Sequence, residues 1–212
     1  MIVLINPNST ESMTTEMVAT ATELGVSVEG WTSHGGPAAI QGPDDGKACV
    51  PPLLKLVQKA SDSGATAIII GCFDDTGLGP AREIADCPVI GVGQAAYHMA
   101  ILAGRRFSVV TTLKVSVPVL TQNIQAYGFD RHLGRVRSSG VPVLALEADP
   151  VGAGAKVIAE IDRAAAEDAV DSVVLGCAGM VGIPDLYGKG RKIRLIDGVK
   201  SAVRIAAHLQ TV

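Results

Sequence analysis

The segment from Ala67 to Cys72 reads AIIIGC, and the segment from Ser172 to Cys177 reads SVVLGC. Each contains a short apolar run, which is typical of a parallel strand buried on both faces of a sheet. Each run is followed by a glycine and a cysteine. The two segments lie 105 positions apart, since 177 − 72 = 105. The chain therefore carries two copies of one strand, each with a thiol at its carboxyl end.

The same offset relates two other positions at strand ends. Asn6 ends the first apolar run of the chain, and Thr111 ends the run that opens the second half. Two agreements at one offset predict an internal duplication, with two similar lobes facing each other across a cleft. Ligands bind at the carboxyl ends of parallel strands. We therefore expect Cys72 and Cys177 to line that cleft together with Asn6 and Thr111.

The rest of the sequence alternates between apolar runs and amphipathic stretches, which predicts parallel sheets with right-handed helical crossovers. Asn8 to Glu11 has the spacing of a capping box, so a helix should follow to about Leu24. Strands are expected at residues 2–5, 26–31, 65–71, 88–92, 107–110, 172–175 and 192–196. Further helices are expected at residues 47–63, 79–86, 94–103, 115–127, 151–169 and 198–209, with a loop at 35–46 and an ambiguous stretch at 132–147.

These patterns predict an α/β fold of two similar parallel-sheet lobes, related by pseudo-twofold symmetry, with the active-site cleft between them. The first lobe is expected to comprise residues 1–96 and 197–212, and the second residues 97–196. Of the 212 residues, 48 % are hydrophobic and only 3 % are aromatic. Most of the core must therefore consist of Ala, Val, Ile and Leu.

Charge and hydropathy argue against several classes of protein. The net charge is −3, from 18 basic and 21 acidic residues, so no basic surface for nucleic acid is expected. No apolar run approaches the roughly 18 residues of a membrane span, and the first residues lack a signal peptide's basic leader. The four cysteines show no CxxC spacing, which argues against a zinc site or a disulfide framework. We expect a cytoplasmic protein with free thiols and no metal or cofactor.

Cys72 and Cys177 each precede small residues that are suited to starting a helix. A thiol at a helix N-terminus has a lowered pKa, because free N–H groups and the helix dipole stabilise the thiolate. The same N–H groups are suited to holding an oxyanion. Two opposed thiols suit the removal of a proton from a carbon beside a carbonyl and its return to the opposite face. The pair therefore predicts two-base racemisation.

The alternative is that both cysteines only pack, since free cysteine is among the most buried residue types. Their matched positions favour catalysis. Cys49 and Cys87 lack such a placement, and each lies close to a proline, so we interpret both as structural.

Other motifs near these positions have simpler interpretations. Asp74 and Asp75 follow Cys72 and are suited either to orienting a ring N–H of a substrate or to capping the next helix. The Gly-Val-Gly sequence at 91–93 lacks the third glycine and the downstream acidic residue of a dinucleotide fingerprint. Neither this pair nor Asp44 and Asp45 in the loop at 35–46 has a histidine beside it in sequence, so metal binding is not indicated.

Over nearly its whole length the sequence resembles the hydantoin racemase group of the Asp/Glu racemase superfamily, a group that includes allantoin racemase. The two cysteine segments are the specific markers. The markers are INPNST at 5–10, GPAAI at 36–40, GCFDDTGL at 71–78, VTTL at 110–113 and GCAGM at 176–180.

The resemblance implies a cofactor-independent two-base racemase whose substrates are 5-monosubstituted hydantoins, cyclic ureides with a C5 hydrogen beside a ring carbonyl. It places the proton carriers at Cys72 and Cys177. It also implies a homo-oligomer. The substrate contacts that it implies are Asn6, Ile40, Phe73, Thr111, Thr112, Ala178 and Gly179.

The residues after each cysteine discriminate among substrates. Amino-acid racemases of the superfamily usually carry Cys-Asn-Thr at both sites, whereas Phe73 and Ala178 stand here, and no Arg or Lys adjoins either thiol to meet a carboxylate. A neutral ring fits better, and Ile40 and Phe73 suggest an apolar pocket at C5. The alternatives are an allantoin racemase, an Asp/Glu-type amino-acid racemase or, in another class, a two-lobe binding protein without catalysis.

Overall fold

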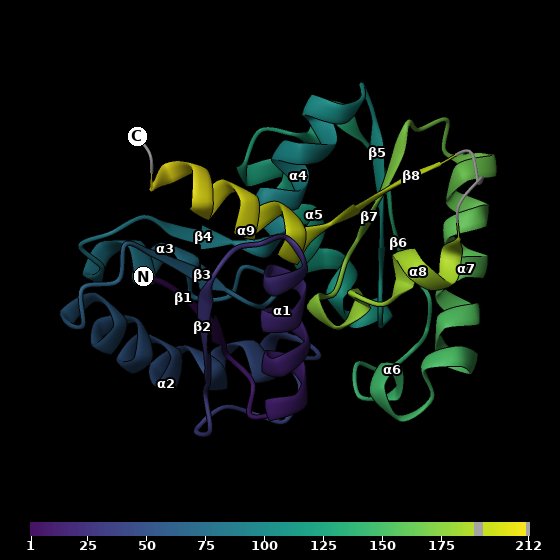
Figure 1. The fold of residues 1–212 in the computed structure, drawn as a ribbon. Coiled ribbons are helices and arrows are strands. Elements are labelled where there is room, and N and C mark those ends of the chain that lie inside the picture. Colours follow the sequence, from purple (N-terminus) through teal and green to yellow (C-terminus); the bar gives the residue numbers. More distant parts are fainter. Residues whose placement is uncertain (189–192, 211–212) are drawn as a thin grey trace.

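A computed structural model describes residues 1–188 and 193–210 of the chain. Two four-stranded parallel sheets form the centre of the fold, and helices cover them (Figure 1). The first sheet has the strand order β2-β1-β3-β4 and the second the order β6-β5-β7-β8. The predicted α/β fold with two parallel-sheet lobes is confirmed.

The bounds of the elements locate every loop that matters for the site. The strands are β1 (Ile2–Asn6), β2 (Val28–Thr32), β3 (Ala67–Ile70), β4 (Val89–Gly91), β5 (Phe107–Thr111), β6 (Leu133–Ser138), β7 (Ser172–Leu175) and β8 (Arg194–Asp197). The α-helices are α1 (Glu11–Glu23), α2 (Pro43–Asp62), α3 (Leu78–Ile84), α4 (Val92–Ala103), α5 (Val117–Ala126), α6 (Ala145–Ala148), α7 (Pro150–Glu167), α8 (Ile183–Tyr187) and α9 (Gly198–Leu209).

The internal duplication extends through both sheets. The strands β1 to β4 begin at residues 2, 28, 67 and 89, and β5 to β8 begin at 107, 133, 172 and 194, so each pair differs by 105. The pairing of the central strands follows the same offset, since Ile2 pairs with Ala67 and Phe107 pairs with Ser172. A single offset therefore describes how the second sheet repeats the first.

Some local predictions are wrong or incomplete. No capping box forms at α1, because the side chain of Asn8 accepts a hydrogen bond from the Thr10 N–H at 2.9 Å and folds the preceding turn instead. The helix α2 begins at Pro43, inside the predicted loop, since proline suits the first turn of a helix. The ambiguous stretch contains β6 and α6. Residue 192, the expected start of the eighth strand, lies outside the described residues.

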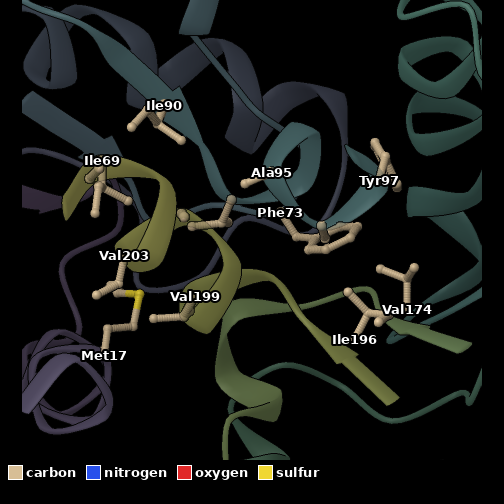
Figure 2. Packing of buried hydrophobic residues seen from close by; sticks show 14 of the residues in the cluster. Met17, Ile69, Phe73, Ile90, Ala95, Tyr97, Val174, Ile196, Val199 and Val203 are labelled. Atoms are coloured by element: carbon tan, nitrogen blue, oxygen red, sulfur yellow. The ribbon is translucent and has the colours of Figure 1, made fainter. Parts of the chain in front are cut away.

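Helices α4 and α9 pack against each other and contact strands of both sheets, so they join the two halves (Figure 1). One apolar core passes through this junction, and Figure 2 shows Ile69 of the first sheet and Val174 of the second among its members. The division into lobes at 96/97 stays a prediction, and that boundary falls within α4. In the described part of the chain, no helix is long and apolar enough to cross a membrane.

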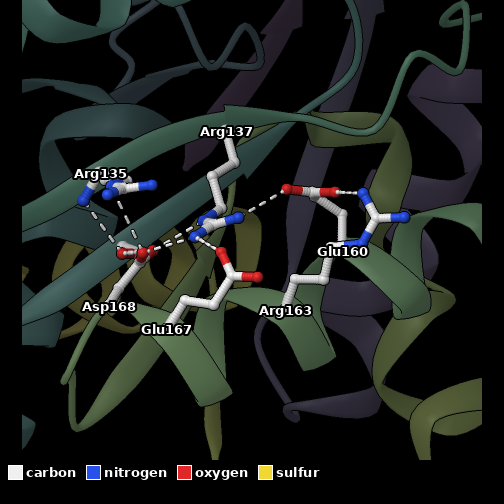
Figure 3. A network of polar contacts seen from close by, with 7 residues as sticks. Arg135, Arg137, Glu160, Arg163, Glu167 and Asp168 are labelled. Carbon is white, nitrogen blue, oxygen red and sulfur yellow. Dashed lines mark hydrogen bonds and ion pairs between the residues drawn. The ribbon is translucent and has the colours of Figure 1, made fainter.

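A polar network at the edge of the second sheet ties β6 to the end of α7 (Figure 3). Arg137 donates to Asp168 at 2.6 and 2.8 Å, to Glu160 at 3.0 Å and to Glu167 at 2.7 Å. The Asp168 carboxylate also accepts from the Ser108 hydroxyl at 2.7 Å, and its side chain is fully buried. Breaking such a buried pair costs far more than breaking an exposed one.

We expect Arg137→Ala to lower the free energy of unfolding by about 3 kcal/mol at pH 7, because the Asp168 carboxylate would stay buried without its main partner. Burial alone would raise the pKa of Asp168, but hydrogen bonds from Arg137 and Ser108 and the charges of Arg137 and Arg135 lower it below its ordinary value. The ion pair therefore stabilises the fold above the unfolded-state pKa of about 4 and is lost as pH falls through the lower folded-state pKa. Urea unfolding followed by circular dichroism measures the free energy of unfolding. The difference between the unmodified protein and Arg137→Ala should become smaller as the pH is lowered toward 3.

The matched control is Arg163→Ala. Arg163 is exposed and makes an i,i+3 pair with Glu160, so this substitution should cost below about 1 kcal/mol. Equal losses for the two variants would contradict the structural role given to Arg137.

Candidate active site

The carboxyl ends of β3 and β7 open onto one cavity whose walls come from both sheets. All ten site residues expected from the sequence line it. They are Asn6, Ile40, Cys72, Phe73, Asp74, Thr111, Thr112, Cys177, Ala178 and Gly179. The cavity has a volume of about 40 Å³. That is room for a few waters, whereas small-molecule sites usually exceed roughly 300 Å³. The structure thus shows a closed form of the site.

A glycine brings each thiol to the cavity. The Gly71 N–H donates to a carbonyl of β1 and the Gly176 N–H to a carbonyl of β5, both at 2.8 Å, so each strand pairing continues one residue beyond the strand. A Cβ on Gly71 would lie 2.8 Å from a methionine sulfur, and one on Gly176 would lie 3.0 Å from the Cβ of Thr111. A side chain at either position would crowd these neighbours, and Cys72 and Cys177 follow directly.

Each thiol has one backbone donor at a matched position. Hydrogen bonding from the backbone N–H of Asp74 acts to lower the pKa of Cys72, and that from the N–H of Gly179 acts to lower the pKa of Cys177. These donors are again 105 apart, since 179 − 74 = 105. A hydrogen bond from an N–H group favours the thiolate over the thiol. The two thiols therefore have equivalent local support from the backbone.

The predicted lowering of the two thiol pKa values is wrong for this closed form. Helix α3 begins only at Leu78, and Cys177 precedes a three-residue 3-10 turn, so neither thiol lies at the start of a long helix. Burial raises the pKa of Cys72 well above its ordinary value and raises that of Cys177 to about 12. The nearby Asp74 charge adds to both increases. Desolvation therefore outweighs the single N–H group at each sulfur.

Asp74 is the one carboxylate among the described residues that line the cavity, and no Lys or Arg accompanies it there. Burial raises the pKa of Asp74 to about 6. Its backbone carbonyl accepts a hydrogen bond from the Asn123 side chain of α5 at 2.7 Å, which ties this loop to the second half. The cavity thus contains a hydrogen-bond acceptor of negative charge and has no cation for a carboxylate ligand.

The amide of Asn6 is engaged within its own loop. Its Nδ2 donates to the Asn8 side chain at 2.9 Å and to the Thr10 carbonyl at 3.0 Å, and its Oδ1 accepts from the Asn8 N–H. Thr111, at the matched position, donates its hydroxyl to the Gly176 carbonyl at 2.8 Å. Both side chains therefore shape the walls, and their contact with a substrate stays a prediction.

The sequence analysis did not identify every residue that lines the cavity, and most of the side chains it missed are apolar. The additional residues are Asn8, Met13, Met17, Ser116 and Val143, beside the two glycines. Val143 lies between β6 and α6, and its N–H donates to the side chain of Gln41 at 3.0 Å. Met13, Ala39 and Val143 form a small buried cluster against Cys177. Loops from both halves therefore cover the cavity, and no sequence signal links them.

The described residues contain no group of three or more His, Cys, Asp or Glu side chains arranged to hold a metal ion. The chemistry on offer at this cavity is therefore that of two thiols, one carboxylate, hydroxyls, amides and backbone N–H groups.

Fold and site together define a two-lobe α/β protein in which each sheet contributes one cysteine to a shared cavity. The family model for Asp/Glu/hydantoin racemases matches residues 2–206. The chain belongs to this family. The resemblance stated from the sequence is thereby confirmed, and so is the enzyme class, an isomerase of the racemase type.

Individual relatives cover almost the whole chain. The hydantoin racemase of Rhizobium meliloti is 44 % identical over 211 residues, which is 97 % of this chain and 87 % of that protein. The hydantoin racemase of Pseudomonas sp. (strain NS671) is 32 % identical over 97 % of this chain and 84 % of its own. The structure of allantoin racemase from Klebsiella pneumoniae superposes with a TM-score of 0.95 at 33 % identity, covering 99 % of this chain and 87 % of that one.

We expect alkylation of Cys72 and Cys177 by iodoacetamide to accelerate about tenfold per pH unit from pH 7 to 9, without a plateau, because only the thiolate reacts and both pKa values lie above this range. Asp74→Asn should accelerate both reactions at a given pH, since it removes a charge that raises both pKa values. Mass spectrometry of the two cysteine peptides measures the rates.

Asp44→Asn, on the exposed start of α2 and outside the cavity, is the matched control and should leave both rates unchanged. A plateau near pH 7 in the unmodified protein would show that the thiols are activated, contrary to the raised pKa values.

Proposed function

We propose that this chain racemises 5-monosubstituted hydantoins without a cofactor, by exchanging the C5 proton between Cys72 and Cys177. The observation that carries the proposal is the pair of thiols, contributed by two repeated strands to one cavity, each with a matched backbone N–H donor. In one direction the Cys72 thiolate removes the C5 proton, and the Cys177 thiol returns a proton to the opposite ring face. The roles reverse for the other enantiomer.

A symmetric pair suits a symmetric reaction. Two enantiomers have equal free energy in water, so kcat/KM is the same in both directions, and each thiol serves as base in one direction and as acid in the other. Charge on one thiol also disfavours charge on the other, since Cys177 contributes to the raised pKa of Cys72. Coupled groups of this kind lose their protons in separate steps. The singly ionised pair, one thiolate and one thiol, is the form that the proposed mechanism uses.

The substrate class follows from what the walls offer. An anionic amino acid would meet the charge of Asp74 and no basic side chain from the described lining, which argues against the Asp/Glu-type alternative. A neutral hydantoin ring suits this cavity better, with Asp74 placed to accept a ring N–H. The named relatives, two hydantoin racemases and an allantoin racemase, support the same class. A cytoplasmic homo-oligomer remains part of the proposal on the sequence resemblance alone.

The C5 substituent should lie against an apolar wall. Ile40, Val143 and Met13 are buried residues that line the cavity. The ring of Phe73 packs instead in the apolar core, edge-on to Tyr97. The ureido group of allantoin would leave its donors and acceptors unpaired against that wall, which costs binding energy. We therefore favour alkyl or arylalkyl substituents over allantoin.

Replacing either catalytic thiol should abolish racemisation. We expect Cys72→Ser and Cys177→Ser each to lower the rate at which an optically pure 5-alkylhydantoin loses optical rotation by about 10²- to 10⁴-fold, the usual contribution of one acid–base group. Polarimetry measures the loss.

The control Cys87→Ser changes a thiol outside the cavity and should keep full activity. Racemisation at the wild-type rate by Cys72→Ser would refute the two-base assignment. Ligand binding without any racemisation by the unmodified protein, unaffected by thiol alkylation, would instead favour the two-lobe binding protein.

A polarimetric series of hydantoins tests the apolar wall. We expect kcat/KM for 5-isopropyl- or 5-benzylhydantoin to exceed that for allantoin by at least about tenfold, because one unpaired buried polar group costs about 1–3 kcal/mol. Val143→Ser places a hydroxyl on the apolar wall and should therefore reduce the ratio of kcat/KM for these hydantoins to kcat/KM for allantoin. A preference for allantoin in the unmodified protein would assign the chain to the alternative substrate.

A further inference from the structure

Asp75, three residues after Cys72, has an unusual backbone and an unusual environment. Its φ is 50°, in the left-handed region that most residues avoid and that Asp tolerates better than others. Its side chain is buried in the closed structure. Such a conformation persists only where the surroundings fix it.

Three donors fix the carboxylate of Asp75. The backbone N–H groups of Gly93 and Gln94 donate to it at 3.0 and 2.7 Å, and the Tyr127 hydroxyl donates at 3.0 Å. The two N–H groups belong to the first turn of α4, where the helix dipole favours a negative charge. A side chain from outside the helix therefore caps α4.

Two glycines at the start of α4 make room for the Asp75 carboxylate. A Cβ on Gly91 would lie 2.1 Å from an Asp75 oxygen, and one on Gly93 would lie 2.8 Å from the other oxygen and 2.3 Å from the Phe73 carbonyl. The Gly-Val-Gly sequence at 91–93, which is no dinucleotide motif, thus has a local explanation. It lets the loop after Cys72 lie directly on the start of α4.

The same loop is also tied to the second half of the molecule. Tyr127 directly follows α5, and Asn123 within α5 donates to the Asp74 carbonyl at 2.7 Å. The Asp74 N–H is in turn the donor at the Cys72 sulfur. Asp75 therefore anchors the segment from Cys72 to Asp75. Two hydrogen bonds join its carboxylate to α4, and one joins it to Tyr127 beside α5.

The Cys177 loop has no equivalent of this anchor. The offset of 105 carries Asp75 onto Met180, a buried apolar residue that packs in the core of the second sheet. The two thiols are thus matched in position, while among the described residues a buried carboxylate holds the Cys72 loop and none is seen at the matched position in the Cys177 loop.

We propose that Asp75 is a positioning residue for Cys72: by joining the start of α4 to Tyr127, it holds the thiol of Cys72, and not that of Cys177, at the ring face that it serves. This inference rests on the proposed racemase function. Misplacing a catalytic group by about 1 Å can cost about 100-fold in rate.

A directional signature follows from the two-base mechanism. For the enantiomer that Cys177 deprotonates, a misplaced Cys72 leaves proton removal intact and slows delivery to the opposite face. The carbanion then regains a proton more often from Cys177, on its original face. In deuterated water the Cys177 thiol can exchange its proton for a deuteron during the longer lifetime of the carbanion, and the starting enantiomer then gains C5 deuterium without inverting. For the enantiomer that Cys72 deprotonates, removal is slowed. Return of a proton by Cys72 to the original face is slowed as well, so for this enantiomer the ratio of exchange to inversion falls.

The experiment measures C5 deuterium incorporation by NMR and inversion by chiral chromatography, for both enantiomers of a 5-alkylhydantoin in deuterated water. Asp75→Asn keeps the side-chain shape and replaces an acceptor with a donor that faces an N–H group. Tyr127→Phe removes one contact and leaves the helix cap. Cys72→Ser and Cys177→Ser identify which enantiomer each thiol deprotonates.

We expect Asp75→Asn to lower kcat by about 10- to 100-fold. The ratio of exchange to inversion should rise for one enantiomer only, the same one as in Cys72→Ser. Tyr127→Phe should shift the same ratio in the same direction by less. Asp171→Asn is the matched control, because its carboxylate also accepts two consecutive backbone N–H groups, at Arg105 and Arg106, outside the cavity.

Loss of folded protein lowers exchange and inversion together and leaves their ratio unchanged. Unchanged ratios in both Asp75→Asn and Tyr127→Phe would therefore overturn the inference, as would a shift matching Cys177→Ser. If Asp75→Asn does not fold, the result with Tyr127→Phe decides. If the wild-type protein neither exchanges nor inverts any hydantoin, the proposed function itself fails, and this inference fails with it.

Discussion

Burial of the two central strands on both faces governs where this protein can place chemistry. All four residues of β3 and all four of β7 are buried, so neither strand exposes a face on which a reactive side chain could meet a ligand. Reactive groups are therefore confined to the points where these strands end. There a glycine continues the strand pairing for one more residue, and the next residue reaches the cavity. The packing of α4 and α9 against strands of both sheets then fixes the relation between the two strand ends.

The duplication divides the site into matched and unmatched parts. The thiols, the glycines before them and the N–H donors at 74 and 179 are matched at one offset. The side chains next to them are not, because Phe73 and Asp74 correspond to Ala178 and Gly179. A proton exchange between mirror-image substrates calls for the matched groups. A ring bound in one orientation presents different edges to the two halves, so the unmatched groups are those suited to recognising it.

The sequence was informative where a short pattern determines structure. The apolar runs and the offset of 105 predicted both sheets, and the strand ends predicted four residues of the cavity lining. Most of the other expected lining residues were implied by the family resemblance. The contact between Gln41 and Val143 was out of reach, because it joins two loops of irregular sequence that meet only in the folded chain. The thiol pKa values were mispredicted for a similar reason. The expectation considered the local N–H groups, whereas the result depends on how completely distant residues exclude water. Gly91 and Gly93 make room for Asp75, and the sequence does not show this because the two segments meet only in the folded chain.

The small cavity and the raised thiol pKa values are two consequences of one closed arrangement. Met13, Ala39 and Val143 pack against the partly buried Cys177, so a thiolate there is poorly hydrated and has one backbone N–H group to stabilise it. In the proposed reaction the singly ionised pair meets the C5 proton in this poorly hydrated cavity. A thiolate that has lost water is a stronger base, so the desolvation that disfavours the thiolate at rest also favours its taking the C5 proton.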